Sequence, residues 1–250
     1  IRGRNLDPDE PGIAQTFAIE TEGANGIAFD RNGNLYVSGG RNGRIYLTGP
    51  EGGRAEVVAQ IAPHSRKLPD GKTEQALTAN GMVFDPQGST LYVTDTARGA
   101  IWKVEFDRQG NLKSAVNCDA TFADNTLCFD SIFIAHPLLD GTDGIALDRA
   151  GNIWNSANER NAIVVVTPRR QVVEIFRNPP DATTLLRNTG PLETPTSPFL
   201  LRHRFCTANS DGNRRDNFPN TGGEIKPTGP IGKISCMDQP LRIPGLRLPL

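Results

Sequence analysis

A short sequence motif that occurs three times constrains the fold of this sequence more than any other feature. The phrase reads Asn/Asp-Gly-Ile/Met-Ala/Val-Phe/Leu-Asp and begins at Asn25, Asn80 and Asp143. After each copy, a polar turn leads into two further strand-like segments: Leu35–Ser38 with Arg44–Leu47, Leu91–Thr94 with Ala100–Val104, and Asn152–Trp154 with Ala162–Val166. A weaker fourth copy runs from Pro195 to Met237 and contains an insertion rich in Gly, Asn and Arg. The repeating unit is therefore strand, turn, strand, turn, strand.

The copies recur at intervals of 55, 63 and 53 residues between Asn25, Asn80, Asp143 and Thr196, slightly longer than the roughly 40 to 50 residues of a propeller blade. A fourth apolar segment follows the third, for example Ala55–Ala59 and Gln171–Phe176. Four strands per unit are typical of a β-propeller. An all-β sandwich with evenly spaced strands is the alternative, but a sandwich has no reason to repeat one phrase at the same point of each unit. We therefore expect an all-β propeller with at least four blades.

Composition agrees with many short strands in one folded domain. The 26 Gly and 19 Pro are spread along the chain, as turns between strands require, and we expect residues 1–250 to form a single propeller domain. The net charge is -1, so we expect neither nucleic acid nor an anionic membrane as a partner. No apolar run has the length of a membrane span. Because there is no starting Met and no signal peptide, we expect residue 1 to be a processed or trimmed end. The oligomeric state stays open.

Propeller geometry predicts where polar side chains gather. The first strand of each blade lines the central channel and the second returns to the starting face, so all blade openings meet at one end, which we call the channel mouth. We expect Asn25, Asn80 and Asp143 to bind a metal ion there. The turns after the second strands should add oxygen ligands: Asp95, Asn155, Asn158, Asn209 and Asp211. Carboxylate and amide oxygens without Cys or His favour Ca²⁺ or Mg²⁺, or another divalent cation, over Zn²⁺.

Several of these residues also have a structural interpretation. Asn-Gly and Asp-Gly pairs are common in turns, because Asn, Asp and Gly tolerate a positive φ. Asp30, Asp85 and Asp148 end the repeated phrase, and we expect them to shape hairpin turns on the face opposite the mouth. Trp102 and Trp154 lie in strands and are expected in the core.

Two other features have a functional and a simpler interpretation. His136 precedes Asp143 by seven residues and could reach the mouth as an acid or base, whereas a packed or solvated His is the simpler interpretation. The arginine-rich turn at 211–217 could bind an anionic substrate through bidentate hydrogen bonds. A solvated loop with internal ion pairs is the simpler interpretation of that turn.

The repeated phrases resemble those of NHL-type and related six-bladed propellers, and most closely the family of senescence marker protein 30, gluconolactonases and luciferin-regenerating enzymes, over roughly residues 20 to 240. In that family, successive blade openings bind one divalent metal ion. The openings Asn25-Gly26, Asn80-Gly81, Asp143-Gly144 and Thr196-Ser197 match the family series in order. The resemblance implies a metal-dependent lactonase or related ester hydrolase with a small-molecule substrate, in which the metal holds the lactone carbonyl and Asp143 activates water or transfers the proton.

The sequence departs from the family pattern at its start. Two earlier family blades, the first of which supplies a Glu ligand, have no counterpart here, so the chain resembles the last four blades of six. Either those blades lie on sequence outside this chain, or the ring closes with fewer blades and Ile13–Ile19 adds an outer strand to the last one. Two other functions stay open: a non-catalytic binding module, and a strictosidine synthase-like propeller with a catalytic Glu at the mouth.

The four cysteines lie in two local pairs. Cys118 and Cys128 bracket a short loop, and Cys206 and Cys236 fall on neighbouring strands of the fourth unit. Four cysteines allow three connectivities, of which this pairing is the local one. Four reduced thiols are the alternative. Disulfides would indicate a secreted or periplasmic protein.

Overall fold

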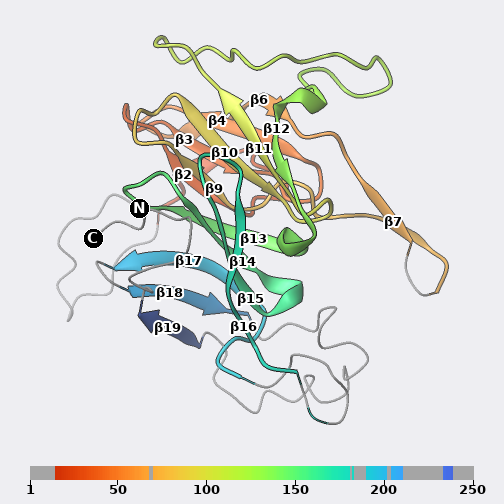
Figure 1. The fold of residues 1–250 in the computed structure, drawn as a ribbon. Helices are drawn as coiled ribbons and strands as arrows, with labels where there is room; N and C mark the ends of the chain where they lie inside the picture. Colours follow the sequence, from red (N-terminus) through yellow and green to blue (C-terminus); the bar gives the residue numbers. More distant parts are fainter. Residues whose placement is uncertain are drawn as a thin grey trace.

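The computed structural model describes residues 15–67, 70–180, 182, 190–201, 204–210 and 233–238. Its framework is four antiparallel sheets, numbered here as blades 1 to 4 in chain order (Figure 1). Blade 1 comprises β2 (Ile27–Phe29), β3 (Leu35–Ser38), β4 (Arg44–Thr48) and β6 (Glu56–Gln60). Blade 2 comprises β9 (Met82–Phe84), β10 (Thr90–Asp95), β11 (Ala100–Glu105) and β12 (Ile132–Ala135). Blade 3 comprises β13 (Thr142–Leu147), β14 (Ile153–Ala157), β15 (Ala162–Val166) and β16 (Val172–Arg177). Blade 4 comprises β17 (Pro195–Leu201), β18 (Arg204–Asn209) and β19 (Ile234–Asp238).

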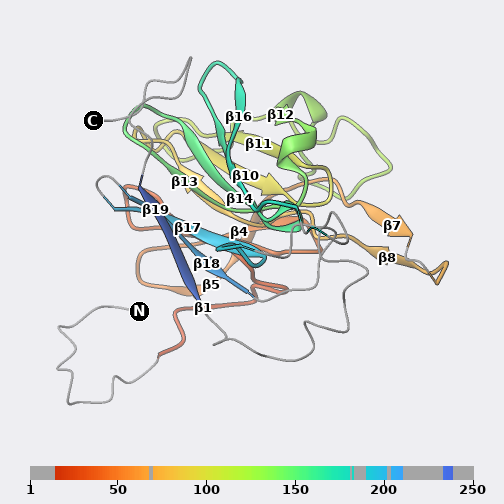
Figure 2. The same ribbon diagram turned by 60° about the horizontal axis from the view of Figure 1, so that its bottom comes forward.

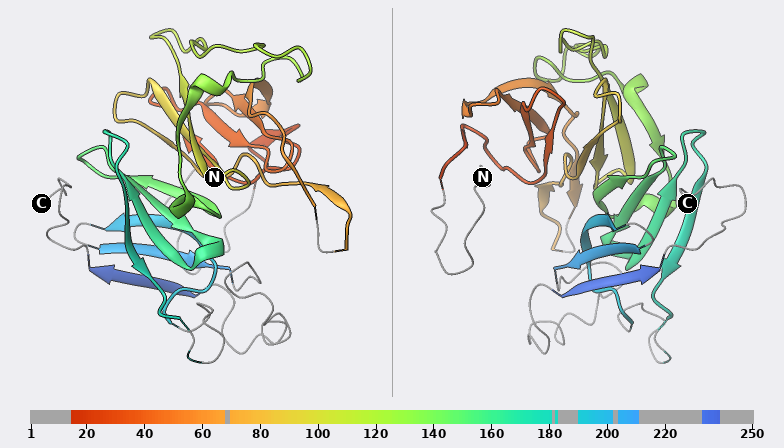
Figure 3. Two further views of the ribbon diagram at one scale, coloured as in Figure 1. Left: turned by 45° about the vertical axis from the view of Figure 1, so that its right-hand side comes forward. Right: turned by 90° about the vertical axis from the view of Figure 1, so that its left-hand side faces the viewer.

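The blades follow one another along an arc, with blade 1 at one end and blade 4 at the other (Figures 2 and 3). This arrangement confirms the all-β propeller predicted from the repeats. The helices in the described residues are three short 3-10 turns: η1 (Phe129–Ser131), η2 (Pro137–Leu139) and η3 (Asn158–Arg160). In this part of the chain no helix is long and apolar enough to cross a membrane.

Aspartates that end the repeated phrase form the turns after the first strands, as predicted. Asp30 Oδ1 accepts hydrogen bonds from the backbone nitrogens of Asn32 and Asn34 at 2.9 and 2.8 Å. Asp148 does the same in blade 3, where its Oδ1 accepts two bonds of 2.9 Å from the backbone. Each carboxylate thus accepts hydrogen bonds from backbone N–H groups of the turn, which strand pairing would otherwise satisfy. The side chains of Asp30 and Asp148 therefore have a structural role.

Apolar side chains fill the space between neighbouring blades. Ile45 of blade 1 packs in one cluster with Met82 of blade 2, and Ile101 of blade 2 packs in another with Ile145 of blade 3. Between blades 3 and 4, the rings of Trp154 and Phe205 stack with their centroids 5.4 Å apart. Trp102 and Trp154 are fully buried, which confirms their predicted place in the core.

The segment at the start of the described chain lies on blade 1. Its strand β1 (Ala18–Ile19) pairs in parallel with β5 (Gly53–Arg54). Phe17 and Ala18 pack against Leu35, Val37 and Tyr46 of blade 1. The expectation that Ile13–Ile19 adds an outer strand to the last blade is therefore wrong for its described part, residues 15–19, because these apolar side chains are covered by blade 1. Residues 13 and 14 lie outside the described chain. A further small sheet joins β7 (Ser65–Lys67) to β8 (Thr73–Gln75).

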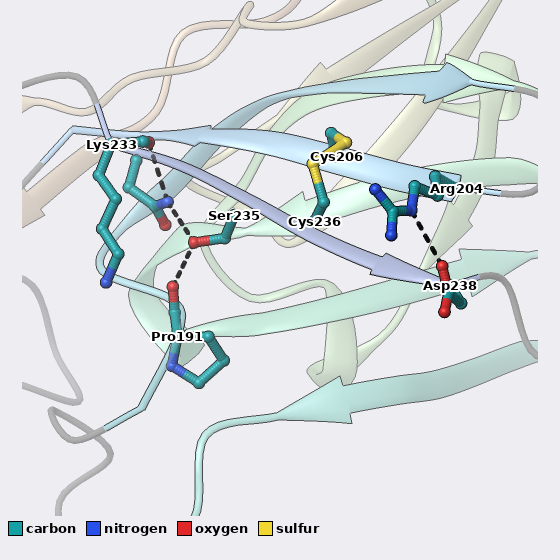
Figure 4. Close-up of a disulfide and its surroundings, with 8 residues drawn as sticks. Pro191, Arg204, Cys206, Lys233, Ser235, Cys236 and Asp238 are labelled. Carbon is teal, nitrogen blue, oxygen red and sulfur yellow. Dashed lines mark hydrogen bonds and ion pairs between the residues drawn. A yellow bond between two sulfur atoms is a disulfide. The ribbon is translucent and has the colours of Figure 1, made fainter.

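Both predicted disulfides are present. Cys118 bonds to Cys128 and Cys206 bonds to Cys236, with Cα–Cα distances of 5.5 and 4.1 Å. The second bridge joins residues that are directly opposite each other on β18 and β19 (Figure 4). Two disulfides are compatible with a secreted or periplasmic protein, because reducing compartments disfavour them.

Candidate active site at the channel mouth

The blade openings lie side by side because a glycine follows the polar residue in each of the first three. The backbone of the next opening occupies the space where a side chain would be. A Cβ on each glycine would collide with a carbonyl oxygen of the following blade: Gly26 with Asn80, Gly81 with Asp143, and Gly144 with Thr196. The four openings therefore form one continuous row, as the propeller geometry predicts.

Buried hydroxyl groups bind the openings of blades 2 and 3 to the blade before each. Ser38 of blade 1 donates its hydroxyl hydrogen to the carbonyl oxygen of Asn80 over 2.7 Å. Thr94, at the equivalent position of blade 2, donates to the carbonyl oxygen of Asp143 over 2.6 Å. These bonds fix the backbone from which the predicted ligands project. Sequence reasoning assigned no role to the two hydroxyls, although their recurrence at one position of the repeat was the available signal.

The side chain of Asp143 is held by the end of the second strand of its own blade. Asn158 Nδ2 donates a hydrogen bond to Asp143 Oδ2 over 2.7 Å. Blade 2 repeats this link with other groups, because Asn80 Nδ2 donates to Thr96 Oγ1 over 3.1 Å. The turns after the second strands thus meet the first-strand openings, as predicted for Asn158.

Two buried amide oxygens beside this link have no hydrogen-bond partner among the described residues. They are Oδ1 of Asn155 and Oδ1 of Asn158, whose side chains are 0% and 2% exposed. The amide nitrogen of Asn155 donates a hydrogen bond to the hydroxyl oxygen of Thr142. A buried acceptor without a donor costs about 1–3 kcal/mol, and a cation is one group that would satisfy such oxygens.

The carboxylate and amide oxygens at the mouth are the ligand type that hard divalent cations prefer. Within the described residues, no group of three or more His, Cys, Asp or Glu side chains could hold a metal ion. Of the three predicted metal ligands, Asp143 is the carboxylate, and Asn25 and Asn80 offer amide oxygens. In Asn80 the nitrogen faces Thr96, and an amide coordinates a cation through its oxygen.

The three predicted metal ligands differ in exposure. Asn25 is exposed, Asp143 is half-buried and Asn80 is buried at 3%. The row of openings places their backbones in sequence along the mouth, whereas hydrogen bonds to Thr96 and Asn158 hold the side chains of Asn80 and Asp143 within their own blades. Their joint binding of one cation stays a prediction.

Asp95 and Asn209 have structural partners instead. The Asp95 carboxylate is fully buried, pairs with Arg98 at 2.8 Å and accepts a hydrogen bond from Trp102 Nε1 at 3.1 Å. Burial raises the pKa of Asp95 above its ordinary value, and the nearby Arg98 offsets only part of that effect. Asn209 Oδ1 accepts from the backbone nitrogen of Glu193. Both side chains therefore support loops at the mouth.

His136 is also explained by local structure. Its Nδ1 accepts a hydrogen bond from the backbone nitrogen of Leu138 over 3.1 Å and caps η2. This bond fits the packed interpretation of His136 and gives no support to a role as acid or base. Asp211 and the arginine-rich turn at 211–217 lie outside the described residues.

The comparison with protein families identifies the repeat. Residues 20–191 match the model of the SMP-30/gluconolactonase/LRE-like region, which covers more than half of the chain. The chain belongs to this family. The SMP-30/gluconolactonase/LRE-like match spans blades 1 to 3 and ends just before blade 4, the blade whose repeat is weakest in the sequence.

Solved structures similar to this SMP-30/gluconolactonase/LRE-like chain have low sequence identity. A calcium-binding protein, regucalcin, from Agrobacterium tumefaciens is 17% identical with a TM-score of 0.40, over 85% of this chain and 75% of that chain. A putative 6-phosphogluconolactonase from Bacteroides fragilis is 14% identical with a TM-score of 0.47, over 72% and 48% of the two chains. A Bacteroides caccae protein of unknown function is 12% identical with a TM-score of 0.41, over 75% and 53%.

This chain spans about half of the Bacteroides caccae protein, and it spans 22% of a Bacteroides thetaiotaomicron extracellular domain that it also resembles. A comparison with curated proteins finds no match. Family membership therefore stands on the match over residues 20–191.

Proposed function

We propose that this chain is a divalent-cation-dependent hydrolase that opens a small lactone or ester at the channel mouth. The observation that carries the proposal is the Asp143–Asn158 hydrogen bond beside two buried amide oxygens that have no donor among the described residues. Membership of a family that includes gluconolactonases supports the reaction class. Ca²⁺ is the first cation to test, and Mg²⁺ is the second, because the donors are all hard oxygens.

Asp143, Asn80 and Asn25 would hold the cation, and Oδ1 of Asn158 would add an amide oxygen from the same blade as Asp143. When bound, such a cation supplies positive charge that polarises a substrate carbonyl. The backbone of Asp143 is fixed from the preceding blade by Thr94, and its side chain is fixed by Asn158. The site is therefore positioned by the scaffold.

Asp143 provides the base of the proposed reaction. A carboxylate can accept the proton of a water molecule as that water attacks the lactone carbonyl, whereas Asn25 and Asn80 cannot accept a proton near neutral pH. The carbon–oxygen bond of the ring then breaks, and the proton returns from Asp143 to the alkoxide that leaves. The product is the open-chain hydroxy acid.

The test is a pH-indicator assay of aldonolactone opening with and without a chelator, followed by addition of Ca²⁺ or Mg²⁺. We expect activity to be lost on chelation and restored by the cation. Asp143→Asn should remove most activity with the fold retained, and Asn80→Ala should weaken cation binding with a smaller effect on the chemical step.

Asp124→Asn is the matched control, because Asp124 is an exposed carboxylate on a loop away from the blade openings. This variant should behave as wild type. Activity that survives both chelation and Asp143→Asn would refute the mechanism. Absence of activity on every lactone tried, with cation bound, would favour the non-catalytic binding module.

A further inference from the structure

A cleft of about 520 Å³ lies between blades 1 and 2, on the face of the propeller opposite the channel mouth. Its walls are the turns that follow the first strands of the two blades, together with the turn after β11. The lining residues are 30–32, 87–89 and 106–110, with Tyr36 and Lys113. Small-molecule sites typically have volumes of about 300–1,000 Å³. The cleft therefore has the size of a ligand site, and the reaction proposed at the mouth does not use it.

Tyr36 brings an unpaired hydroxyl group to this cleft. Its side chain lies in the core between blades 1 and 2 and is 2% exposed. Its ring meets the ring of Phe106 edge-on, with the centroids 5.5 Å apart, and both residues line the cleft. The Tyr36 hydroxyl forms no hydrogen bond with any described residue. Because buried hydroxyl groups are normally hydrogen-bonded, this one is available to a ligand.

The Tyr36 hydroxyl is a hydrogen-bond donor near neutral pH. Burial raises the pKa of Tyr36 to about 12, and the negative charge of Asp30 adds to this effect. The group therefore keeps its proton. A ligand with acceptor oxygens fits such a group.

Three basic side chains line the same cleft: Arg31, Arg108 and Lys113. None of them forms an ion pair with an acidic side chain among the described residues. Arg31 extends from the turn of blade 1 onto the equivalent turn of blade 2, because a Cβ on Gly88 would lie 3.2 Å from its Cγ and Cδ. The backbone of blade 2 thus supports the stem of Arg31, and its guanidinium group remains available to a ligand.

The two acidic residues of the cleft are bound within their own turns. Asp30 accepts hydrogen bonds from the backbone nitrogens of Asn32 and Asn34, and Asn34 Nδ2 donates to its Oδ2 over 2.7 Å. Asp107 is held in the same way, by two backbone nitrogens and by the side chain of Asn111. The three basic groups therefore outnumber the two carboxylates, and the cleft favours an anion.

We propose that this cleft binds a small phosphate monoester. The phosphate would contact the two guanidinium groups and Lys113, because guanidinium groups match phosphate oxygens bidentately. The Tyr36 hydroxyl would donate to a further phosphate oxygen, and the organic group would lie on the ring of Phe106. A phosphate monoester carries a charge of about −1.5 to −2 near pH 7. It therefore complements three cations better than a carboxylate, which carries a single charge.

The first test is calorimetric titration of the whole chain with phenyl phosphate in a buffer that contains chelator and no phosphate. The chelator keeps a cation at the mouth from binding the probe. We expect binding at one site. Inorganic phosphate lacks an organic group for Phe106, and benzoate carries a single charge, so each should bind at least about 10-fold more weakly. No binding of phenyl phosphate, or equal binding of either comparison compound, would overturn the proposal.

The second test places the binding in this cleft. Arg31→Gln should weaken binding of phenyl phosphate by about 10-fold or more, because it removes a charge-assisted hydrogen bond. Tyr36→Phe should weaken it by about 3- to 10-fold and leave the free energy of unfolding unchanged, because the hydroxyl has no partner in the protein.

Arg149→Gln is the matched control. Arg149 is exposed and follows Asp148 in the equivalent turn of blade 3, as Arg31 follows Asp30 in blade 1, but it does not line the cleft. This variant should bind phenyl phosphate as wild type does. Equal loss of binding in Arg149→Gln and Arg31→Gln, or unchanged binding in both Arg31→Gln and Tyr36→Phe, would overturn the assignment of the site.

Discussion

Asn158 Nδ2 lies 2.7 Å from Asp143 Oδ2, and this contact joins the end of the second strand of blade 3 to the start of its first. The bond orients the carboxylate along the mouth. The other end of the same amide, Oδ1, is buried without a partner in the described residues. A side chain that donates to the proposed base and presents an acceptor beside it can position both the base and a cation.

Asn158→Ala should therefore lower activity without removing the base. We expect a fall in kcat of about 10- to 100-fold, together with weaker cation binding, which is typical of residues that orient a ligand. Calorimetric titration with Ca²⁺ measures the binding separately from turnover. Asn32→Ala is the control, because Asn32 is exposed on the opposite face of the propeller. Unchanged Ca²⁺ affinity in Asn158→Ala would contradict the positioning role.

Thr94→Val tests the hydroxyl that fastens the openings together. Valine keeps the shape of threonine but cannot donate to the carbonyl oxygen of Asp143, which Thr94 Oγ1 now approaches to 2.6 Å. Because Thr94 is fully buried, we expect a loss of about 1–3 kcal/mol in the free energy of unfolding. Urea denaturation measures it. The exposed Thr73 provides a control in Thr73→Val, and equal effects in both variants would refute the inter-blade role.

Gly81→Ala tests the close approach of neighbouring openings. An added Cβ would lie 2.5 Å from the carbonyl oxygen of Asp143 and 2.6 Å from the Cα of Gly144. Because both atoms belong to the backbone, the collision cannot be relieved by a side-chain rotation, and we expect a destabilisation of at least about 1–3 kcal/mol. Gly49→Ala is the control, since nothing lies within 4 Å of its added Cβ. A Gly81→Ala variant as stable as Gly49→Ala would show that the row of openings is loosely packed.

The repeat predicted most of the fold because each of its signals is local. Alternating apolar residues define the strands, and Asp30 and Asp148 bond to backbone atoms two and four residues away. Those interactions depend little on the rest of the chain. The disulfides could be predicted for the same reason, since directly opposed strands place Cys206 beside Cys236.

The rest of the structure depends on contacts between distant residues. Parallel pairing of β1 with β5 has no local signal, so the segment around Ala18 was placed on the wrong blade. The repeat predicts the position of Asp143 at a blade opening. The hydrogen-bond partner of its carboxylate could not be predicted, because that contact depends on the conformation of the turn after β14. Asp95 was predicted at the mouth, yet burial beside Arg98 and Trp102 gives it a structural partner.

Asp95→Asn should change how stability depends on pH. Burial raises the pKa of Asp95 above its ordinary value of 3.8, so the folded state binds this proton more tightly than the unfolded state. The contribution of Asp95 to the free energy of unfolding therefore falls as pH rises above 3.8 and becomes constant above the folded-state pKa. The Arg98 pair forms with the ionised carboxylate and is already part of the folded-state pKa of Asp95, so the slope against pH is the readout. Urea unfolding in steps from about pH 3 to 8 should show the free energy of unfolding of the variant rising relative to that of wild type as pH rises.

Asp107→Asn should show the opposite trend below pH 3.8, with the free energy of unfolding of wild type rising relative to that of the variant as pH rises, because hydrogen bonds from Asn111 lower the pKa of the exposed Asp107. A flat difference for Asp95→Asn would mean that Arg98 fully compensates the burial of this carboxylate.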